Sequence, residues 1–382
     1  MTFTKTIATR GPGCADKTTV ESMRDAGLNC VLINTAHGDI KQYEDLLGLV
    51  DDDPNIATMI DVKGPQIRIE LDNAVTLAED ETFSVGFEEG DMPRLNYDLF
   101  DDLSVDDTVF FDEGYVETKV VTKESGRVVL RAEHDATIKP GKGVNIPGSE
   151  LGLPALTSKD KHMLRFAKKH GVDYVAQSFV RRPGDLAETK EILGDDPMKI
   201  IAKIENHEGV DNLLDIISSS DGVMIARGDL GVELPQQRIP AVQKRIVRET
   251  ARQSKISVVA TQMLESMTEN PKPTRAEVSD VANAVLDGTD AVMLSGETAI
   301  GSHPVGAVRT MRDVSAAIEN DISTEVVTND AASISEDMSR AASTVAQHQD
   351  ADAFVVVGEG TRQTRLLSRY RLNTKIISVT ET

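Results

Sequence analysis

Residues 199–231 read KIIAKIENHEGVDNLLDIISSSDGVMIARGDLG, and this stretch indicates the fold class. Two apolar runs rich in β-branched residues, 199–205 and 222–227, flank an amphipathic segment at 207–218. Continuous apolar runs are typical of parallel strands that are buried on both faces. A strand, a helix and a second strand in this order form a βαβ unit, so we expect a parallel sheet with covering helices.

The same unit recurs on both sides of this stretch. Further strand-like runs are 5–9, 30–36, 57–63, 174–180, 257–262 and 291–295. The remaining amphipathic segments are 17–27, 39–50, 159–171, 184–194, 238–253, 276–286 and 304–319. Eight such units predict a closed (β/α)8 barrel of the TIM type, whose usual length is about 250 residues. An open doubly wound sheet is the alternative that the pattern alone leaves.

One barrel unit is interrupted by a stretch without helical periodicity. Between residues 69 and 148 the chain alternates in short runs at 82–86, 108–111, 115–122 and 127–131. Exposed loops tolerate domain insertions, and the catalytic loops of a barrel are such loops. We therefore expect a small inserted β-barrel domain at 69–148.

The composition changes again after residue 319. Runs typical of a helix, a strand, a helix and a strand follow at 336–347, 353–357, 361–370 and 375–379. The sequence thus predicts an α/β protein of three domains. They are a barrel of residues 1–68 and 149–319, the inserted domain of 69–148, and a truncated α/β C-terminal domain of 320–382.

The charge balance excludes two classes of partner. The chain has 63 acidic and 41 basic side chains and a formal net charge of −22. Nucleic acids and anionic membrane surfaces need basic patches, so neither is expected as a partner. No apolar run approaches the about 20 residues of a membrane span. The large acid excess, with only 4% aromatic residues, favours a salt-adapted protein over an ordinary acidic one.

The cysteines and the N-terminus bear on the compartment. Cys14 and Cys30 are too few for a disulfide framework or a zinc cluster. The first residues have no apolar core of a signal peptide. We therefore expect a cytoplasmic protein with reduced thiols.

Charged residues gather where the predicted strands end, which is where (β/α)8 barrels carry their active sites. Lys203 and Glu205 share one face of their strand because side chains alternate with period two. Asp229 follows the next strand in the turn 227–231. Carboxylates on adjacent strands suit Mg²⁺ or Mn²⁺, and a lysine beside them suits the charge that develops in phosphoryl transfer. A structural ion pair and a simple capped turn are equal alternatives for each motif by itself.

With these residues in place, the chain resembles the pyruvate kinase family. The shared motifs, in chain order, are DVKGPQIR at 61–68, KGVNIPG at 142–148, KIEN at 203–206, ARGDLGVE at 226–233, ATQMLESM at 260–267 and LSGETA at 294–299. The likeness covers about residues 3–320. It implies a barrel, an inserted lid and a C-terminal α/β domain. It also implies a glycolytic phosphotransferase that uses phosphoenolpyruvate and ADP to make ATP and pyruvate, and we expect a homo-oligomer.

The resemblance implies the following catalytic and substrate-binding roles. Lys203 would stabilise the transferring phosphoryl group, and Glu205 and Asp229 would bind Mg²⁺ or Mn²⁺. The backbone of Gly228 and Asp229, with Thr261, would bind the substrate carboxylate. Arg227 is a further expected substrate-binding residue, and Thr261 and Arg68 join Lys203 in the catalytic set.

The resemblance also implies sites for the nucleotide and for a monovalent cation. Arg68, Lys142 and His37 would contact the nucleotide. A K⁺ ion would be held by Asn34, by Asp61 and by the carbonyl of Val62. Closure of the lid would exclude water from the reaction.

Several positions depart from the family pattern. Leu32 stands where the family has an arginine that contacts the phosphoryl group, and such a charged hydrogen bond contributes about 1.5–3 kcal/mol. Ala36 stands where the family has a serine that helps to bind the monovalent cation. Arg10 replaces an apolar residue on the neighbouring strand end, and we hypothesise that it partly substitutes for the missing arginine. Gln66 stands where the family has Glu or Lys, a choice linked to K⁺ dependence.

Two alternative functions remain at this point. The first is a catalytically weakened paralogue that binds phosphoenolpyruvate or assembles with a full-length partner, and Leu32 and the short C-terminal domain favour it. The intact lysine and metal carboxylates oppose it, because a decaying site would be expected to lose them. The second is a pyruvate-aldolase-like barrel, which the inserted domain and the nucleotide contacts Lys142 and Arg68 oppose.

Overall fold

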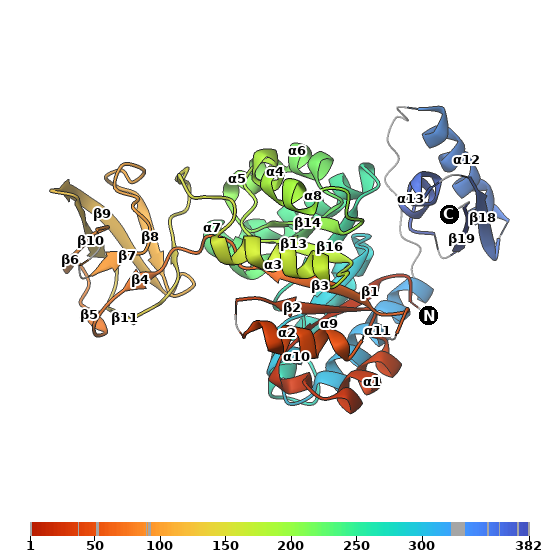
Figure 1. Cartoon of the computed structure of the whole chain (residues 1–382), viewed down its shortest axis with the longest axis horizontal. Helices are drawn as coiled ribbons and strands as arrows, with labels where there is room; N and C mark the ends of the chain where they lie inside the picture. Colours follow the sequence, from red (N-terminus) through yellow and green to blue (C-terminus); the bar gives the residue numbers. More distant parts are fainter. Residues whose placement is uncertain are drawn as a thin grey trace.

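The computed structural model describes residues 2–36, 38–50, 53–88, 90, 93–321, 333–349, 351–358, 360–372 and 374–380. Figure 1 shows three regions along the long axis of the molecule. A β-rich insert (residues 69–148, called the insert below) lies at one end. The barrel lies in the middle, and the C-terminal region lies at the other end.

Eight parallel strands close into the barrel in the order β1-β17-β16-β15-β14-β13-β3-β2. The strands are β1 (Lys5–Arg10), β2 (Cys30–Asn34), β3 (Ala57–Val62), β13 (Tyr174–Gln177), β14 (Lys199–Ile204), β15 (Gly222–Ala226), β16 (Ile256–Ala260) and β17 (Ala291–Leu294). Strand β1 pairs with both β2 and β17, so the sheet has no free edge. The predicted (β/α)8 fold is thereby confirmed, and the open doubly wound sheet is excluded.

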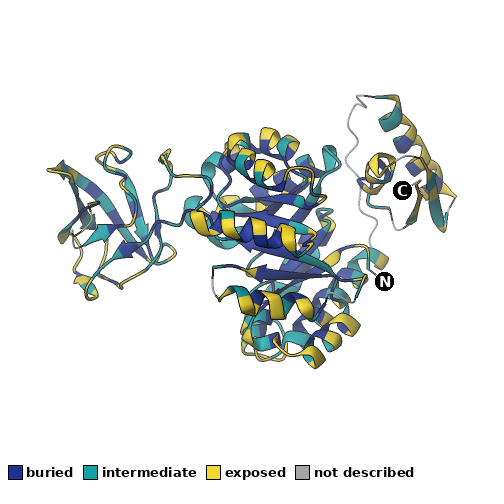
Figure 2. Cartoon of the chain, in the orientation of Figure 1, coloured by how far each residue is buried: buried dark blue, intermediate teal, exposed yellow. Residues whose placement is uncertain are grey.

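Helices surround the barrel and bury one face each against its strands (Figure 2). They are α1 (Lys17–Ala26), α2 (Ile40–Gly48), α3 (Ser158–Lys169), α4 (Ala187–Leu193), α5 (His207–Asp211), α6 (Leu213–Ser219), α7 (Arg227–Glu233), α8 (Ile239–Arg252), α9 (Arg275–Leu286), α10 (Gly296–Ala299) and α11 (Pro304–Asp321), with short 3-10 turns at Pro12–Cys14, Pro183–Leu186, Gln236–Arg238 and Glu265–Thr268. Capping boxes start α2, α3 and α9 and satisfy backbone N–H groups that the helices leave open. The expected single helix at 207–218 is two helices, α5 and α6, that meet at Asn212.

Two apolar cores follow from the alternation of side chains along the barrel strands. One core fills the barrel and includes Ile7, Leu32, Met59 and Met224. The other, larger core lies between the strands and the helices. Leu32 is only 1% exposed, so the position where the family has an arginine is part of the apolar filling of this barrel.

The insert has its own sheet and its own core. Its strands are β4 (Ile69–Glu70), β5 (Val75–Leu77), β6 (Thr82–Val85), β7 (Arg94–Leu95), β8 (Thr108–Phe111), β9 (Val116–Glu124), β10 (Arg127–Ala132), β11 (Ala136–Ile138) and β12 (Val144–Asn145). Five of them form a sheet in the order β12-β8-β9-β10-β6 around a separate apolar cluster. The runs β6, β8, β9 and β10 match the predicted ones. The other strands have only two or three residues, too few to show a periodic pattern.

The C-terminal region is a small α/β unit that contacts the barrel. It comprises α12 (Ile334–His348), β18 (Ala353–Val357), α13 (Arg362–Ser368) and β19 (Lys375–Val379), and its two strands pair in parallel. Arg371 joins it to the barrel, with Nη2 2.7 Å from Asp290 Oδ2 and Nε donating to the carbonyl of Gly288 at 2.7 Å. Of the helices in the described part of the chain, none has the length and apolarity needed to cross a bilayer.

Candidate active site

Lys203 lies at the centre of the polar residues at the barrel mouth. It is the fifth residue of β14, and its Nζ is 3.1 Å from Asp61 Oδ2 and 3.0 Å from Glu205 Oε1. The same Nζ donates to Ser178 Oγ at 2.7 Å. These partners come from the ends of β3, β13 and β14, which are neighbours in the barrel. Closure of the sheet therefore brings together residues that are up to 144 positions apart in the chain.

Burial makes the electrostatic coupling at this mouth strong. Glu205 is 1% exposed and Asp61 is 7% exposed. Burial raises the pKa of Glu205, Asp61 and Asp229, against the opposing effect of the Lys203 charge. For Lys203, burial alone would lower the pKa, but the three carboxylates together raise it. Lys203 therefore stays protonated at neutral pH, as a cation facing the mouth.

Glu205 and Asp229 are the carboxylates that would hold a divalent cation. The N–H of Phe179 donates to Glu205 Oε2 at 2.6 Å and fixes that side chain. Phe179 has φ of 55°, a conformation that non-glycine residues seldom adopt, so this hydrogen bond orients a strained turn. Among the described residues, no group of three His, Cys, Asp or Glu side chains converges as a metal site by itself. Two carboxylates completed by water and substrate oxygens fit Mg²⁺ or Mn²⁺, which keep such ligands.

Thr261 and Gly228 meet directly beside this carboxylate pair. The N–H of Gly228 donates to Thr261 Oγ1 at 2.8 Å, and that hydroxyl donates to the carbonyl of Ala260 at 2.6 Å. Thr261 has φ of 67°, and the next residue, Gln262, has φ of 52°. The strained turn after β16 thus presents Thr261 to the first turn of α7, where Gly228 and Asp229 lie.

Arg227 is held by contacts within the chain. Its guanidinium forms an ion pair with Asp280 at 2.7 Å and donates to the carbonyl of Thr261 at 2.7 Å and to that of Gln262 at 3.1 Å. Its donors are thus engaged by the chain itself. In the structure Arg227 supports the turn that carries Thr261, and its expected role in substrate binding stays a prediction.

Arg68 and Lys142 lie together where the insert joins the barrel. Residue 68 forms a backbone bridge with Gly143, and the N–H of Ile69 donates to the carbonyl of Lys142. Arg68 donates to Gln66 Oε1 at 2.6 Å and also to the carbonyl of Gly141. Lys142 pairs with Asp112 at 2.7 Å. The structure thus places the two predicted nucleotide contacts side by side, whereas His37 lies outside the described residues.

The residues expected to bind K⁺ already have hydrogen-bond partners within the chain, and their role toward K⁺ stays a prediction. Ala36 has no side-chain oxygen, and Asn34 Oδ1 already accepts the N–H of Ala36 at 2.8 Å. The Asp61 carboxylate is engaged by Lys203 and by Ser178, the latter at 3.2 Å, and the carbonyl of Val62 accepts the N–H of Ser178.

Arg10 is buried on the wrong side of its strand to replace the missing arginine. It shares a strand face with Ala8, which packs in the outer core, whereas Ile7 faces the barrel interior. Its guanidinium donates to the carbonyl of Ala15 at 3.3 Å. Burial lowers the pKa of Arg10, and the charge of Asp16 opposes that shift. The hypothesis that Arg10 substitutes for an arginine at position 32 is therefore not supported.

Two residues of the site were not predicted from the sequence. Ser178 binds Lys203, and the backbone of Phe179 binds Glu205. Both lie in the stretch QSFVR at 177–181, which also resembles the family, but no role could be assigned to either from the sequence. A left-handed backbone at a phenylalanine has no signature in a single sequence.

Comparisons with known proteins agree with this geometry. A family model described as "Pyruvate kinase, barrel domain" matches residues 1–308. The chain is 38% identical over 404 residues to a pyruvate kinase of Bacillus licheniformis, covering 100% of this chain and 69% of that protein. It is 36% identical over 399 residues to one of Geobacillus stearothermophilus, covering 99% and 68%.

A solved structure is similar over the whole described fold. A crystal structure of a pyruvate kinase from Cryptosporidium parvum matches with a TM-score of 0.94 and 32% sequence identity, covering 100% of this chain and 83% of that one. The matched barrel, the full-length relatives and this shared fold lead to one conclusion: the chain belongs to the pyruvate kinase family of phosphotransferases, and pyruvate kinase is its function.

Proposed function

We propose that the barrel mouth transfers the phosphoryl group of phosphoenolpyruvate to ADP, with Lys203 as the central catalytic residue. The observation that supports this is the contact of Lys203 with Asp61, Glu205 and Ser178 at the strand ends. In the reaction the P–O bond to the enol oxygen breaks and a bond to an oxygen of the β-phosphate of ADP forms. The enolate then takes up a proton to give pyruvate. Lys203, kept protonated by its carboxylate neighbours, faces the charge on the moving phosphoryl group.

A divalent cation, Mg²⁺ or Mn²⁺, would be held by Glu205 and Asp229. When bound, it supplies positive charge that neutralises phosphoryl and substrate oxygens. Lys203 faces three carboxylates, those of Asp61, Glu205 and Asp229, and such an ion would balance the excess of negative charge. The chain contributes the rest of the geometry, because Phe179 fixes Glu205 and the first turn of α7 fixes Asp229.

The remaining contacts position the two substrates. Thr261 and the backbone of Gly228 and Asp229 would bind the carboxylate of phosphoenolpyruvate, with Arg227 supporting their turn. Arg68 and Lys142, at the base of the insert, would contact the phosphates of ADP. Held substrates turn a bimolecular reaction into an effectively unimolecular one, and this accounts for much of catalysis in phosphoryl transfer.

We also propose a cytoplasmic homo-oligomer. Cys14 and Cys30 are both free and buried, which suits a reducing compartment. One face of the β18–β19 pair exposes apolar side chains in register, which suits burial against another chain. These side chains are Val355, Val357, Ile377 and Val379.

The test of the proposed site is pyruvate formation from phosphoenolpyruvate and ADP with Mg²⁺, followed by a coupled assay in low and in molar KCl. We expect activity in wild-type protein and a loss of at least about a thousandfold in Lys203→Met, because the variant keeps the size of the side chain but removes its charge. Arg238→Met, far along the chain in a surface turn, is the matched control. Activity that does not depend on Lys203 would overturn the site, and no activity in any salt would favour the weakened paralogue.

A further inference from the structure

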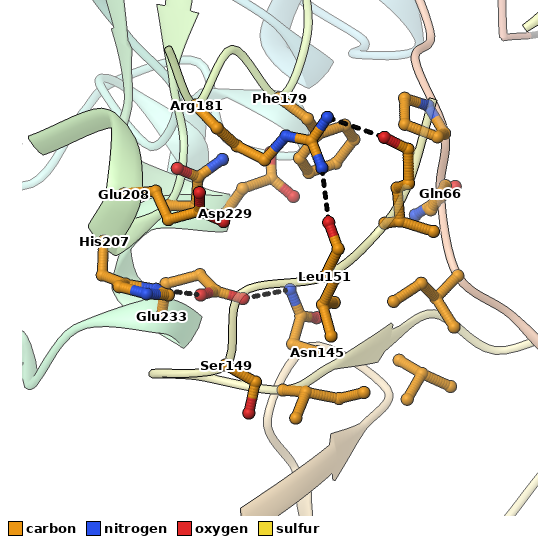
Figure 3. Close-up of a pocket in the computed structure, with 16 residues that line it drawn as sticks. Gln66, Asn145, Ser149, Leu151, Phe179, Arg181, His207, Glu208, Asp229 and Glu233 are labelled. Carbon is orange, nitrogen blue, oxygen red and sulfur yellow. Dashed lines mark hydrogen bonds and ion pairs between the residues drawn. The ribbon is translucent and has the colours of Figure 1, made fainter. Parts of the chain in front are cut away.

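Glu233 lies in the cavity between the insert and the barrel and contacts both (Figure 3). It is the last residue of α7 and its side chain is 10% exposed. Its Oε1 accepts a hydrogen bond from Asn145 Nδ2 at 3.1 Å, and its Oε2 is 3.6 Å from His207 Nδ1. The same His207 nitrogen lies 3.4 Å from the N–H of Gly148. A single carboxylate therefore links strand β12 of the insert to two helices of the barrel.

The barrel side of this link leads to the metal carboxylate. Glu233 lies four residues after Asp229 on the short helix α7, which is one helical turn. The first turn of α7 also carries Gly228 in contact with Thr261. Because Gly228, Asp229 and Glu233 lie on the same short helix, a movement of Glu233 would also move the residues proposed to bind the substrate and the metal.

The insert side of the link leads to the nucleotide contacts. Asn145 pairs with Phe110 and Val144 with Phe111 in the sheet of the insert. Lys142 precedes Asn145 by three residues and pairs with Asp112, directly after β8. The hydrogen bond to Glu233 therefore fixes the segment that holds Lys142.

A second contact anchors the chain segment that follows the insert sheet. Arg181 is held by Asp185 at 3.2 Å and donates to the carbonyls of Leu151 and Leu153, each at 2.8 Å. These carbonyls lie on the return to the barrel, beyond the sheet of the insert (Figure 3). The Arg181 contacts fix where the chain re-enters the barrel, whereas the hydrogen bond from Asn145 to Glu233 reaches a strand of the insert sheet itself.

We propose that Glu233 is a positioning residue that holds the insert, through Asn145, at the distance from α7 at which Lys142 and Asp229 serve one reaction. The expected change in the KM for ADP rests on the proposed function. The expected change in the distance between insert and barrel rests on the contacts alone. The hydrogen bond joins two side chains, Asn145 and Glu233, that are outside the set proposed to bind the phosphoryl group and the metal. A merely structural role would change stability and leave the nucleotide affinity as it is.

The first experiment separates the two substrates. In Asn145→Ala and Glu233→Ala, we expect the KM for ADP to rise about tenfold while the KM for phosphoenolpyruvate changes less, because the loosened side carries Lys142. The double variant is expected to show no further rise, since both changes remove one link. Glu208→Gln, a carboxyl change in the same cavity, is the matched control with unchanged kinetics.

The second experiment exchanges donor and acceptor. Asn145→Asp places two carboxylates against each other and is expected to raise the KM for ADP more than Asn145→Ala does. Adding Glu233→Gln restores a hydrogen bond with the roles reversed, and we expect most of the loss to be recovered. Failure of this exchange to recover the KM for ADP, with melting temperatures unchanged, would overturn the proposal.

The third experiment needs no turnover. Nitroxide labels on Ser125→Cys in the insert and Asp215→Cys on α6 report the distance between insert and barrel, and the native Cys14 and Cys30 are buried. We expect a broader distance distribution with Glu233→Ala than in the parent protein. An unchanged distribution would overturn the proposal. A broadened distribution in a protein without any activity would support the positioning role and overturn the proposed function alone.

Discussion

At the scale of single residues, the site is organised by charge inside an apolar barrel. Lys203 satisfies three polar partners, and each partner is itself fixed by the strand end that carries it. Removal of Lys203 or of one of its carboxylate partners would leave a buried charge without a counter-charge. The free-energy cost of that charge exceeds the stabilisation that the intact ion pair provides. Leu32 interrupts this pattern, because an apolar side chain fills the place next to the mouth where the family has a cation.

The Leu32 position yields a direct prediction. Leu32→Arg is expected to increase kcat/KM for phosphoenolpyruvate by about tenfold or more, because a charged hydrogen bond to the phosphoryl group contributes about 1.5–3 kcal/mol. Steady-state kinetics at saturating ADP would show it. Leu32→Met keeps an apolar side chain of similar size and is the control that should leave kcat/KM near the wild-type value. Equal kinetics in both variants would mean that other groups already satisfy the phosphoryl oxygens.

At the scale of elements, caps and turns hold the loops at the mouth. The carboxylate of Glu277 in α9 accepts hydrogen bonds from the backbone and the hydroxyl of Ser266 at 2.7 and 2.5 Å. It also accepts from the N–H of Thr274 at 2.7 Å. One side chain therefore caps α9 and fixes the turn that follows the Thr261 segment, which connects helix stability to site geometry.

This cap predicts a pH-dependent stability. Burial opposes ionisation of Glu277, but the hydrogen bonds from Ser266 and Thr274 outweigh it and lower its pKa below the usual value of 4.5. Its contribution is therefore present above pH 4.5 and is lost as the pH falls through the lowered value. We expect Glu277→Gln to cost about 1–3 kcal/mol of unfolding free energy at pH 7.

Urea unfolding at several pH values measures this effect. The difference between wild type and Glu277→Gln should shrink as the pH falls below 4.5, because the wild-type carboxylate loses its advantage when protonated. A change at an exposed acidic residue of α1, Glu21→Gln, serves as the control and should have little effect at any pH. If the difference in unfolding free energy between wild type and Glu277→Gln did not change with pH, the stabilisation by the cap would come from side-chain shape and not from charge.

At the scale of the whole molecule, charge is distributed in two ways. The net charge of −22 belongs to the surface as a whole, whereas Lys203, Arg68 and Lys142 lie at or beside the barrel mouth. An acidic surface therefore does not prevent binding of anionic substrates. Self-repulsion of the surface does oppose the compact state, and counter-ions reduce it.

The salt dependence of stability follows from this distribution. We expect the melting temperature to rise between about 0.1 and 2 M KCl, because screening lowers the repulsion among acidic side chains. Differential scanning calorimetry measures it, and NaCl at the same ionic strength should act alike if screening is the cause. A melting temperature that falls with salt would contradict the salt-adapted interpretation.

The sequence by itself determined the barrel and most of the chemistry at its mouth. Eight buried apolar runs that alternate with amphipathic segments predict a parallel sheet with both faces covered, and their number favours the closed barrel over an open doubly wound sheet. Polar strand ends marked Lys203, Glu205 and Asp229 as candidates, while their roles and that of Thr261 came from the family resemblance and stay predictions. Such local motifs are recognised from the periodicity and spacing of residues, and both can be read from a single sequence.

The tertiary structure decided everything that depends on side-chain direction across distant segments. It turned Arg227 toward Asp280, placed Arg10 on the outer face of β1 and brought Ser178 to Lys203. It also joined Asn145 to Glu233, which lie 88 positions apart. The physical reason is that a strand face and a left-handed turn are set by packing in the closed barrel, whereas sequence pattern reports only which residues are available there.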